Sequence, residues 1–211
     1  MISITRKGLQ GLNDAVADQL KQEFEQKHSI FLPQLVEESI LQKIIRDIES
    51  ASFYENEHTS KDKVFATDLS IQSKNIALHQ IRFVLNNPQL FQLIEHISGC
   101  LPIKGFACRI YKNLPGAGHH LDWHDDTSVP SRLVGLSINL GREKYSGGVF
   151  QLREKGKEEL LREVRCGNPG DTHIFRVSSD LEHRVTQTTG EHPRIASAGW
   201  FFSEDPSPWY K

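Results

Sequence analysis

The sequence predicts an α+β fold in which an N-terminal layer of helices packs on a C-terminal double-stranded sheet. Two observations predict it. Apolar residues recur with the helical period through the first half of the chain, and beyond Gly99 that period gives way to short apolar runs separated by Gly, Pro, Asn and Asp clusters. We therefore expect one domain over residues 1–211, with a mainly helical support layer in 1–98 and a strand-rich core in 99–205.

Four segments of the first half are predicted to be helices because their apolar residues fall on one face. Residues 38–51 give the clearest pattern, and Pro88 suits the first turn of the last helix. The intervening residues 52–70 are polar and charged, so we expect a surface loop there, with at most a short strand. The predicted helices are residues 12–28, 38–51, 76–85 and 90–97.

The second half is predicted to form short strands bounded by turn residues. In residues 133–140 the even-numbered positions are all apolar, which indicates a strand with one more apolar face. Several such strands in succession favour a sandwich or a barrel. The predicted strands are residues 106–111, 133–140, 148–152, 172–177 and 195–202, with 30–32 as an earlier strand or extended link.

Composition excludes several classes of function. Hydrophobic residues make up 37% and charged residues 25%, as in soluble globular proteins. The net charge is −2 without a basic block, so a nucleic acid is not expected as a partner. Three cysteines without CxxC spacing argue against a disulfide framework and a structural zinc site. No signal peptide or membrane-spanning run is visible, so we expect a cytoplasmic protein without a membrane partner.

Histidines and carboxylates cluster in the second half. Two neighbouring His-x-Asp units occur, one made by His120 and Asp122 and the other by His124 and Asp126, and His183 follows far along the chain. Residues two apart on a strand face the same side, so either unit could offer an imidazole and a carboxylate to one ion. With a second histidine, this makes the 2-His-1-carboxylate set that suits non-heme iron and leaves positions open.

We favour His124 and Asp126 over the other unit. They lie far enough from the turn at 115–116 to sit on a strand, and the loop 127–131 follows them directly. A ligand pair at the end of a strand, beside a loop, lies where a barrel keeps its accessible mouth. The unit formed by His120 and Asp122 remains the alternative.

Arg194 is the candidate anion-binding residue. It shares one strand face with Ala196, Ala198 and Trp200, and the two small alanines leave room in front of a guanidinium. An inward-pointing Arg would be costly without an anionic partner, and its planar fork of donors matches a carboxylate. We predict that it holds the carboxylate of an organic co-substrate; the alternative is a surface cation.

Taken together, these motifs resemble the Fe(II)- and 2-oxoglutarate-dependent dioxygenases, in particular the prolyl 4-hydroxylase-like branch. The resemblance covers roughly residues 104–203 and rests on the order and spacing of the motifs. The matching elements are Pro115-Gly116, His124-Asp125-Asp126, Gly147-Gly148, Asn168-Pro169-Gly170-Asp171, His183-Arg184-Val185, Gly190 to Arg194 and Trp200-Phe201. The paired glycines are expected to form a turn and to carry no chemistry.

The resemblance implies a jelly-roll core, also called a double-stranded β-helix, with the N-terminal helices packed on one sheet. It implies that His124, Asp126 and His183 bind Fe(II) and form the catalytic centre. Arg194 would bind 2-oxoglutarate together with Tyr111, for which Arg109 on the same strand face is a rival.

The implied reaction uses O2 and releases succinate and CO2 while hydroxylating an unactivated C–H bond, with ascorbate as a candidate reductant. The substrate would be a peptide, a protein side chain or a small molecule, selected by residues 53–68 and 127–132. Two other functions stay open. One is a cupin-type metal-dependent dioxygenase or isomerase without 2-oxoglutarate, in which His119 or His120 would join the metal. The other is a non-enzymatic binding module.

Overall fold

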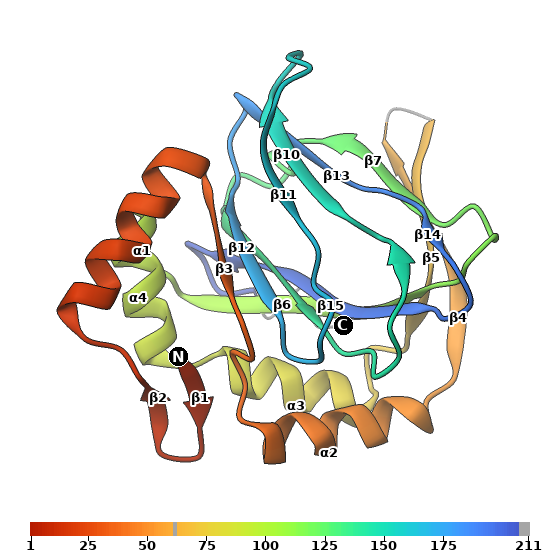
Figure 1. The fold of residues 1–211 in the computed structure, drawn as a ribbon, viewed down its shortest axis with the longest axis horizontal. Coiled ribbons are helices and arrows are strands. Elements are labelled where there is room, and N and C mark those ends of the chain that lie inside the picture. Colours follow the sequence, from red (N-terminus) through yellow and green to blue (C-terminus); the bar gives the residue numbers. More distant parts are fainter. Residues whose placement is uncertain (61–62, 207–211) are drawn as a thin grey trace.

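The computed structural model describes residues 1–60 and 63–206, which contain four helices and fifteen strands (Figure 1). The helices are α1 (Asp14–Lys27), α2 (Glu38–Glu49), α3 (Ile76–Leu85) and α4 (Pro88–Ser98). The strands are β1 (Ser3–Thr5), β2 (Gly8–Gln10), β3 (Ser29–Leu32), β4 (Phe53–Ser60), β5 (Lys63–Ile71), β6 (Gly105–Asn113), β7 (His120–His124), β8 (Arg132–Asn139), β9 (Ser146–Gly147), β10 (Phe150–Glu154), β11 (Leu160–Val164), β12 (Thr172–Arg176), β13 (Leu181–Val185), β14 (Thr188–Thr189) and β15 (Arg194–Phe202).

The main sheet is folded over on itself as a jelly roll. Its strands follow the order β11-β10-β13-β7-β5-β6-β15-β8-β12-β3, and β4 pairs with β5 beside this path. All of these pairs are antiparallel. The pairing of β7 with β5 joins a sheet that starts at β11 to a larger one that ends at β3. The predicted double-stranded β-helix is therefore confirmed.

The helices cover the outer face of the larger sheet, with α2 and α3 along its base and α1 and α4 at its side (Figure 1). One apolar cluster fills this interface, where Ile44 of α2 and Leu78 of α3 are buried together with Phe201 of β15. All four predicted helices are confirmed to within two residues at each end. Asn87 caps the start of α4, and Pro88 occupies the first turn as predicted.

A second, smaller apolar cluster lies inside the barrel. It contains Phe150 and Leu152 of β10, Phe175 of β12 and Val185 of β13. Buried polar side chains share the barrel interior, among them His173, His183 and Arg194. Because burying polar groups is costly unless they have partners, this polar lining indicates a site for a ligand.

Residues 52–70 correct one prediction. In place of a surface loop, β4 and β5 form a long antiparallel hairpin, and β5 continues into pairs with both β6 and β7. The hairpin is polar because its inward side chains bond to one another; Ser70 donates to Asp68 at 2.7 Å. Polar and charged residues occur on both faces of the hairpin, which obscures the alternation that marks a strand. Residues 61–62 lie outside the described part of the chain.

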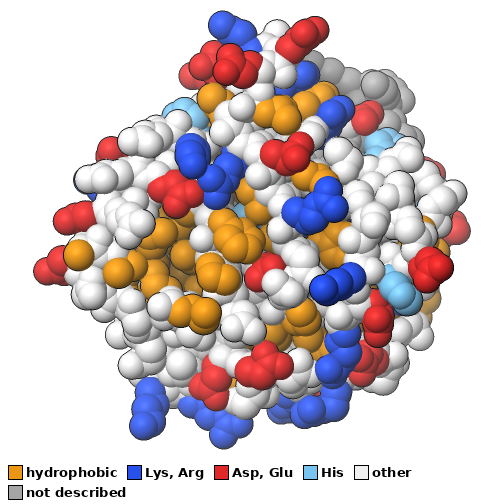
Figure 2. Space-filling model, viewed as in Figure 1, with side chains coloured by type: hydrophobic (Ala, Val, Ile, Leu, Met, Phe, Trp, Pro, Cys, Tyr) orange, Lys and Arg blue, Asp and Glu red, His pale blue; other side chains and the backbone are white. Residues whose placement is uncertain are grey.

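The surface agrees with the composition. On the face in Figure 2, Lys and Arg side chains are interspersed with Asp and Glu around a patch of hydrophobic side chains. Within the described residues, no helix has the length and apolar character needed to span a bilayer.

Candidate metal centre

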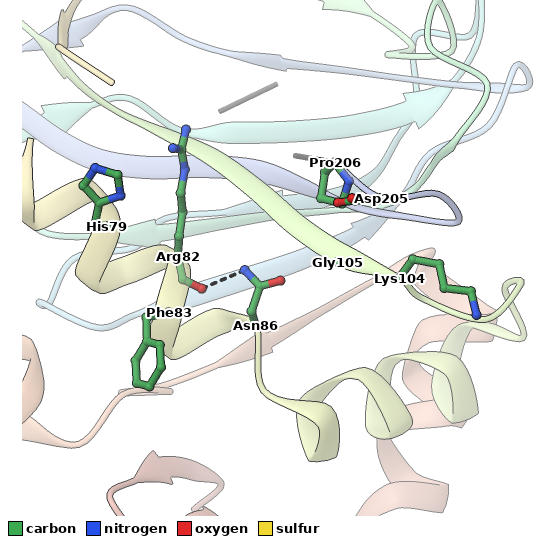
Figure 3. Close-up of a pocket in the computed structure, with 8 residues that line it drawn as sticks. All are labelled: His79, Arg82, Phe83, Asn86, Lys104, Gly105, Asp205 and Pro206. Atoms are coloured by element: carbon green, nitrogen blue, oxygen red, sulfur yellow. Dashed lines mark hydrogen bonds between the residues drawn. The ribbon is translucent and has the colours of Figure 1, made fainter. Parts of the chain in front are cut away.

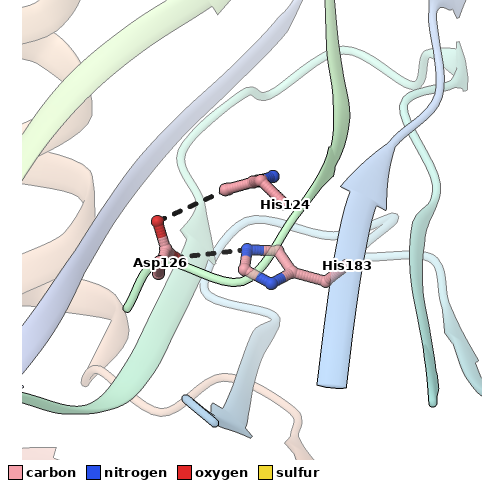
Figure 4. A group of neighbouring side chains, drawn as sticks. All are labelled: His124, Asp126 and His183. Atoms are coloured by element: carbon pink, nitrogen blue, oxygen red, sulfur yellow. Dashed lines mark ion pairs between the residues drawn. The ribbon is translucent and has the colours of Figure 1, made fainter. Parts of the chain in front are cut away.

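Two imidazole rings and one carboxylate meet in the wall of a cavity (Figure 4). Their possible ligand atoms all lie within 4.8 Å of one another. The Nε2 atom of His124 is 3.5 Å from Asp126 Oδ1, and that of His183 is 3.3 Å from Asp126 Oδ2. The three residues favoured from the sequence are thus brought together, with the donor types of a 2-His-1-carboxylate site.

Strand pairing and one turn create this arrangement. His124 at the end of β7 lies directly opposite His183 of β13, and their ring centroids are 4.1 Å apart. Asp126 lies two residues beyond the strand with φ of 62°, a left-handed conformation that Asp tolerates better than most residues. The expectation that His124 and Asp126 share one strand face was wrong in this detail, because the turn directs the carboxylate toward the imidazoles.

The orientation of His124 is fixed from its other nitrogen. Its Nδ1 lies 2.7 Å from the backbone oxygen of Asp122, so this nitrogen donates a proton and Nε2 is left as the ligand atom. A backbone carbonyl in this role is usual for histidines that bind metals.

The alternative unit does not assemble a comparable site. The Nε2 of His120 is 3.8 Å from Asp122, and its Nδ1 bonds to the backbone oxygen of Gly118. His119 accepts a hydrogen bond from the backbone of Leu114. Among the residues that the structure describes, the only group of three potential metal ligands is the one with His183.

The pKa values of the three groups favour the binding of a cation. Burial alone would raise the pKa of Asp126, but hydrogen bonds and charge from His124 and His183 hold it well below its ordinary value. Burial lowers the pKa of His183, and the charge of His124 adds to that effect. Burial also acts to lower the pKa of His124, yet Asp126 raises it overall. The carboxylate is therefore ionised, and it attracts positive charge to the cluster.

Two further residues hold the carboxylate and were not identified from the sequence. Trp200 of β15 donates its indole N–H to Asp126 Oδ2 at 2.8 Å. The guanidinium of Arg132 lies 3.5 Å from Asp126 Oδ1 and 3.7 Å from the Trp200 ring. The sequence offered two signals for Trp200, its shared strand face with Arg194 and its place in the Trp200-Phe201 motif, but neither indicated a contact with Asp126.

Arg194, at the start of β15, is buried, with 3% of its surface exposed. It donates to the hydroxyl of Tyr111 at 2.6 Å and lies 3.4 Å from Ser137 Oγ. Within the described residues it has no carboxylate partner, and its buried Nε has no acceptor. Burial acts to lower its pKa, but Tyr111 and Tyr145 raise it overall. A buried cation of this kind requires an anion for compensation.

Gly148 makes room for this arginine. Its φ is 58°, and a Cβ at this position would lie 2.6 Å from Arg194 Cδ and 3.0 Å from the Tyr145 ring. The prediction that Gly147 and Gly148 serve only as a turn is therefore incomplete. Gly147 meets the backbone of Gln187, as a turn residue would, whereas Gly148 lies against the buried arginine.

One cavity of about 670 Å³ connects these groups. Its wall includes all three residues of the His-Asp-His cluster, and Tyr111 and Ser137 separate it from Arg194. Side chains that line it include Arg109, Arg132, Phe150, His173, Val185 and Trp200. The cavity is large enough for a small organic acid beside a metal ion.

A smaller cavity of about 320 Å³ lies between α3 and the start of β6 (Figure 3). Its polar residues stabilise the fold. Asn86 donates to the backbone oxygens of Arg82 and Phe106, and Arg82 donates to the backbone oxygen of Cys108. We therefore assign the candidate site to the cavity that contains the His-Asp-His cluster.

The His-Asp-His cluster inside this jelly roll has the donor set of a mononuclear non-heme metal site. Residues 106–202 match the family profile described as the 2OG-Fe(II) oxygenase superfamily. This match covers just under half of the chain, and the fold is shared with two solved prolyl hydroxylases. The sequence comparison with curated proteins gives no match.

Solved structures share this fold over nearly the whole chain. A 2OG-Fe(II) oxygenase family oxidoreductase from Burkholderia pseudomallei is 14% identical, with a TM-score of 0.69 over 92% of this chain and 93% of the other. A Trichoplax adhaerens prolyl hydroxylase in complex with a hypoxia inducible factor peptide is 14% identical, with a TM-score of 0.67 over 89% of both chains. A Pseudomonas putida prolyl-4-hydroxylase is 16% identical, with a TM-score of 0.64 over 90% of this chain and 100% of the other.

Proposed function

We propose that this enzyme is an Fe(II)- and 2-oxoglutarate-dependent hydroxylase, with His124, Asp126 and His183 as its iron ligands. The observation that carries the proposal is the buried guanidinium of Arg194, which lacks an acidic partner in the described structure and lies behind a His-Asp-His cluster. When bound, Fe(II) would supply the activation of O2 coupled to the conversion of 2-oxoglutarate to succinate and CO2.

The residues present fit both groups. Two imidazole nitrogens and one ionised carboxylate are the donor set of non-heme Fe(II) oxygenases. Arg194 would bind the distal carboxylate of 2-oxoglutarate, helped by the hydroxyls of Tyr111 and Ser137. The apolar side chains of Phe150 and Val185 would exclude water along the carbon chain.

Hydroxylation of a peptide, a protein side chain or a small molecule is the form of the reaction that we propose. Two of the solved structures with this fold are prolyl hydroxylases, and one of them holds a peptide. Another is the non-heme alpha ketoglutarate dependent epimerase SnoN, so the oxidation product has to be tested directly. A cupin-type dioxygenase or isomerase without 2-oxoglutarate would leave the buried Arg194 without a role.

The test measures succinate and CO2 released from 2-oxoglutarate with added Fe(II), with and without ascorbate. In parallel, 2-oxoglutarate should raise the melting temperature of protein loaded with redox-inert Mn(II), because a ligand stabilises the state that it binds. The proposal would be overturned if 2-oxoglutarate at millimolar concentration caused no turnover and no thermal shift. A metal-dependent activity without any 2-oxoglutarate effect would favour the cupin-type alternative.

Removing the indole donor should weaken the metal site. In Trp200→Phe, Asp126 loses its 2.8 Å hydrogen bond, and Arg132 keeps an aromatic ring beneath it. Loss of such a supporting bond lowers metal affinity by about 10- to 100-fold. Titration with Mn(II) measures the effect. Trp123→Phe is the matched control, because Trp123 stacks on Arg153 and Arg184 and should leave the affinity unchanged.

A methyl group at Gly148 should displace Arg194 and weaken 2-oxoglutarate binding. We expect Gly148→Ala to raise the KM for 2-oxoglutarate by about tenfold, equivalent to about 1.4 kcal/mol, with little change in metal affinity. Gly156→Ala has a similar φ of 76° with open space around the added Cβ, so it controls for backbone strain. Equal KM values in the two variants would contradict the proposed packing role.

A further inference from the structure

Arg109 is a second arginine on the wall of the cavity that holds the His-Asp-His cluster. Along β6 it stands between Tyr111, which contacts Arg194, and Ala107, whose pairing partner Trp200 contacts Asp126. Along the strand, Arg109 therefore lies between the neighbourhood of Arg194 and the candidate metal site. About 29% of its side chain is exposed, whereas Arg194 is buried.

The β4–β5 hairpin contacts one end of the Arg109 guanidinium through Asp68 and Ser70. Nη1 donates to the carboxylate of Asp68 and lies 3.2 Å from Ser70 Oγ. Asp68 itself is 4% exposed and has His58 at 3.3 Å as a second partner. Burial alone would raise the pKa of Asp68, but His58 and Arg109 hold it at about 2, so this anchor stays ionised at neutral pH.

The other edge of the guanidinium remains available. In the described structure, Nε and Nη2 of Arg109 have no hydrogen-bond acceptor, and the guanidinium carbon lies 4.8 Å from the centre of the Tyr111 ring. Two parallel N–H donors on a fixed guanidinium match the two oxygens of a carboxylate. The anchor at Nη1 removes much of the rotational freedom that an exposed arginine would lose on binding.

We propose that Arg109 binds a carboxylate of the primary substrate, so that the substrate class of this enzyme is a carboxylic acid. This inference rests on the proposed function, which assigns the deeper Arg194 to 2-oxoglutarate. The rival sequence prediction, in which Arg109 binds 2-oxoglutarate, is disfavoured because Arg194 is the one in contact with Tyr111. The acid would lie across the cavity with its carboxylate on β6 and its reacting carbon near the His-Asp-His cluster.

The carboxylate could stand at a chain end or on a side chain, and matched probes separate these sources. One set contains N-acetyl L-amino acids and their primary amides. The other contains N-acetyl aspartate and glutamate α-amides, compared with the asparagine and glutamine α-amides. Calorimetric titration uses protein loaded with Mn(II) and saturating 2-oxoglutarate, so that no probe competes for Arg194 and no turnover occurs.

At least one acid should bind about 10- to 100-fold more tightly than its own amide, as expected for a charge-assisted bidentate pair. Arg109→Gln should remove this preference. Arg109→Lys keeps a cation beside Asp68 but loses the two parallel N–H donors of the guanidinium, and should reduce the preference several-fold. Arg142→Gln is the control, because Arg142 pairs with Glu49 and does not line the cavity.

The inference is overturned if the wild-type protein prefers no acid, if Arg109→Gln keeps the preference, or if the preference is unchanged in Arg109→Lys. Should Arg109→Gln fail to fold, an unchanged preference in Arg109→Lys is sufficient to reject it. The thermal shift caused by 2-oxoglutarate is read in the same proteins. Absence of this shift in the wild type would reject the proposed function. If the wild type keeps the shift but binds no acid more tightly than its amide, only the role of Arg109 is rejected.

Discussion

Replacing His183 or Asp126 by alanine is expected to abolish 2-oxoglutarate turnover and metal binding together. Each residue supplies one of three converging ligand atoms, and Asp126 lies within 3.5 Å of both histidine Nε2 atoms. Loss of a residue that merely supports a ligand costs 10- to 100-fold, so loss of a ligand itself should cost at least about 100-fold. Metal content and succinate release measure the two effects.

The neighbouring His-x-Asp unit provides a control within the same few residues. His120→Ala and Asp122→Asn should keep full metal content, because the site uses the backbone oxygen of Asp122 and not its side chain. A full rate in His183→Ala would reject the ligand assignment. A loss of metal in His120→Ala, with Asp126→Ala unaffected, would move the site to the alternative unit.

The sequence contains the residues of the candidate site but not the geometry that joins them. The spacing of the His-x-Asp units and the distant His183 was visible, whereas the choice between units depended on a weak argument about turns. The structure supplies the missing information through the pairing of His124 with His183 and the left-handed turn at Asp126. Neither cross-strand register nor a positive φ at an aspartate can be read from residue types alone.

Helices and apolar strands were predictable because their patterns reflect burial on one face, as in α2. The β4–β5 hairpin was not, because its inward face is polar and Asp68 is buried by ion pairing. The same difficulty concealed Trp200 and Gly148, whose roles depend on neighbours remote in sequence. Hydrophobic periodicity thus predicts the scaffold better than the ligand-binding interior.

Replacing Arg194 by leucine should separate stability from function. The substitution removes a buried cation that has no carboxylate partner in the described structure, and apolar side chains at such positions are often neutral or stabilising. We therefore expect the ligand-free melting temperature to stay the same or to rise. The thermal shift caused by 2-oxoglutarate should vanish, and the KM for 2-oxoglutarate should rise by roughly 100-fold or more, because breaking a buried charge pair costs about 3–5 kcal/mol.

Arg194→Lys is the matched variant, because it keeps the charge but loses the planar fork that reaches both Tyr111 and Ser137. Its KM for 2-oxoglutarate should lie between those of the wild type and the leucine variant, while metal affinity stays unchanged in all three. A leucine variant that still responds to 2-oxoglutarate would show that another residue binds the distal carboxylate. If it instead fails to fold without ligand, Arg194 stabilises the barrel through its two hydroxyl partners, and the buried cation is no longer a reason to expect an organic acid in the cavity.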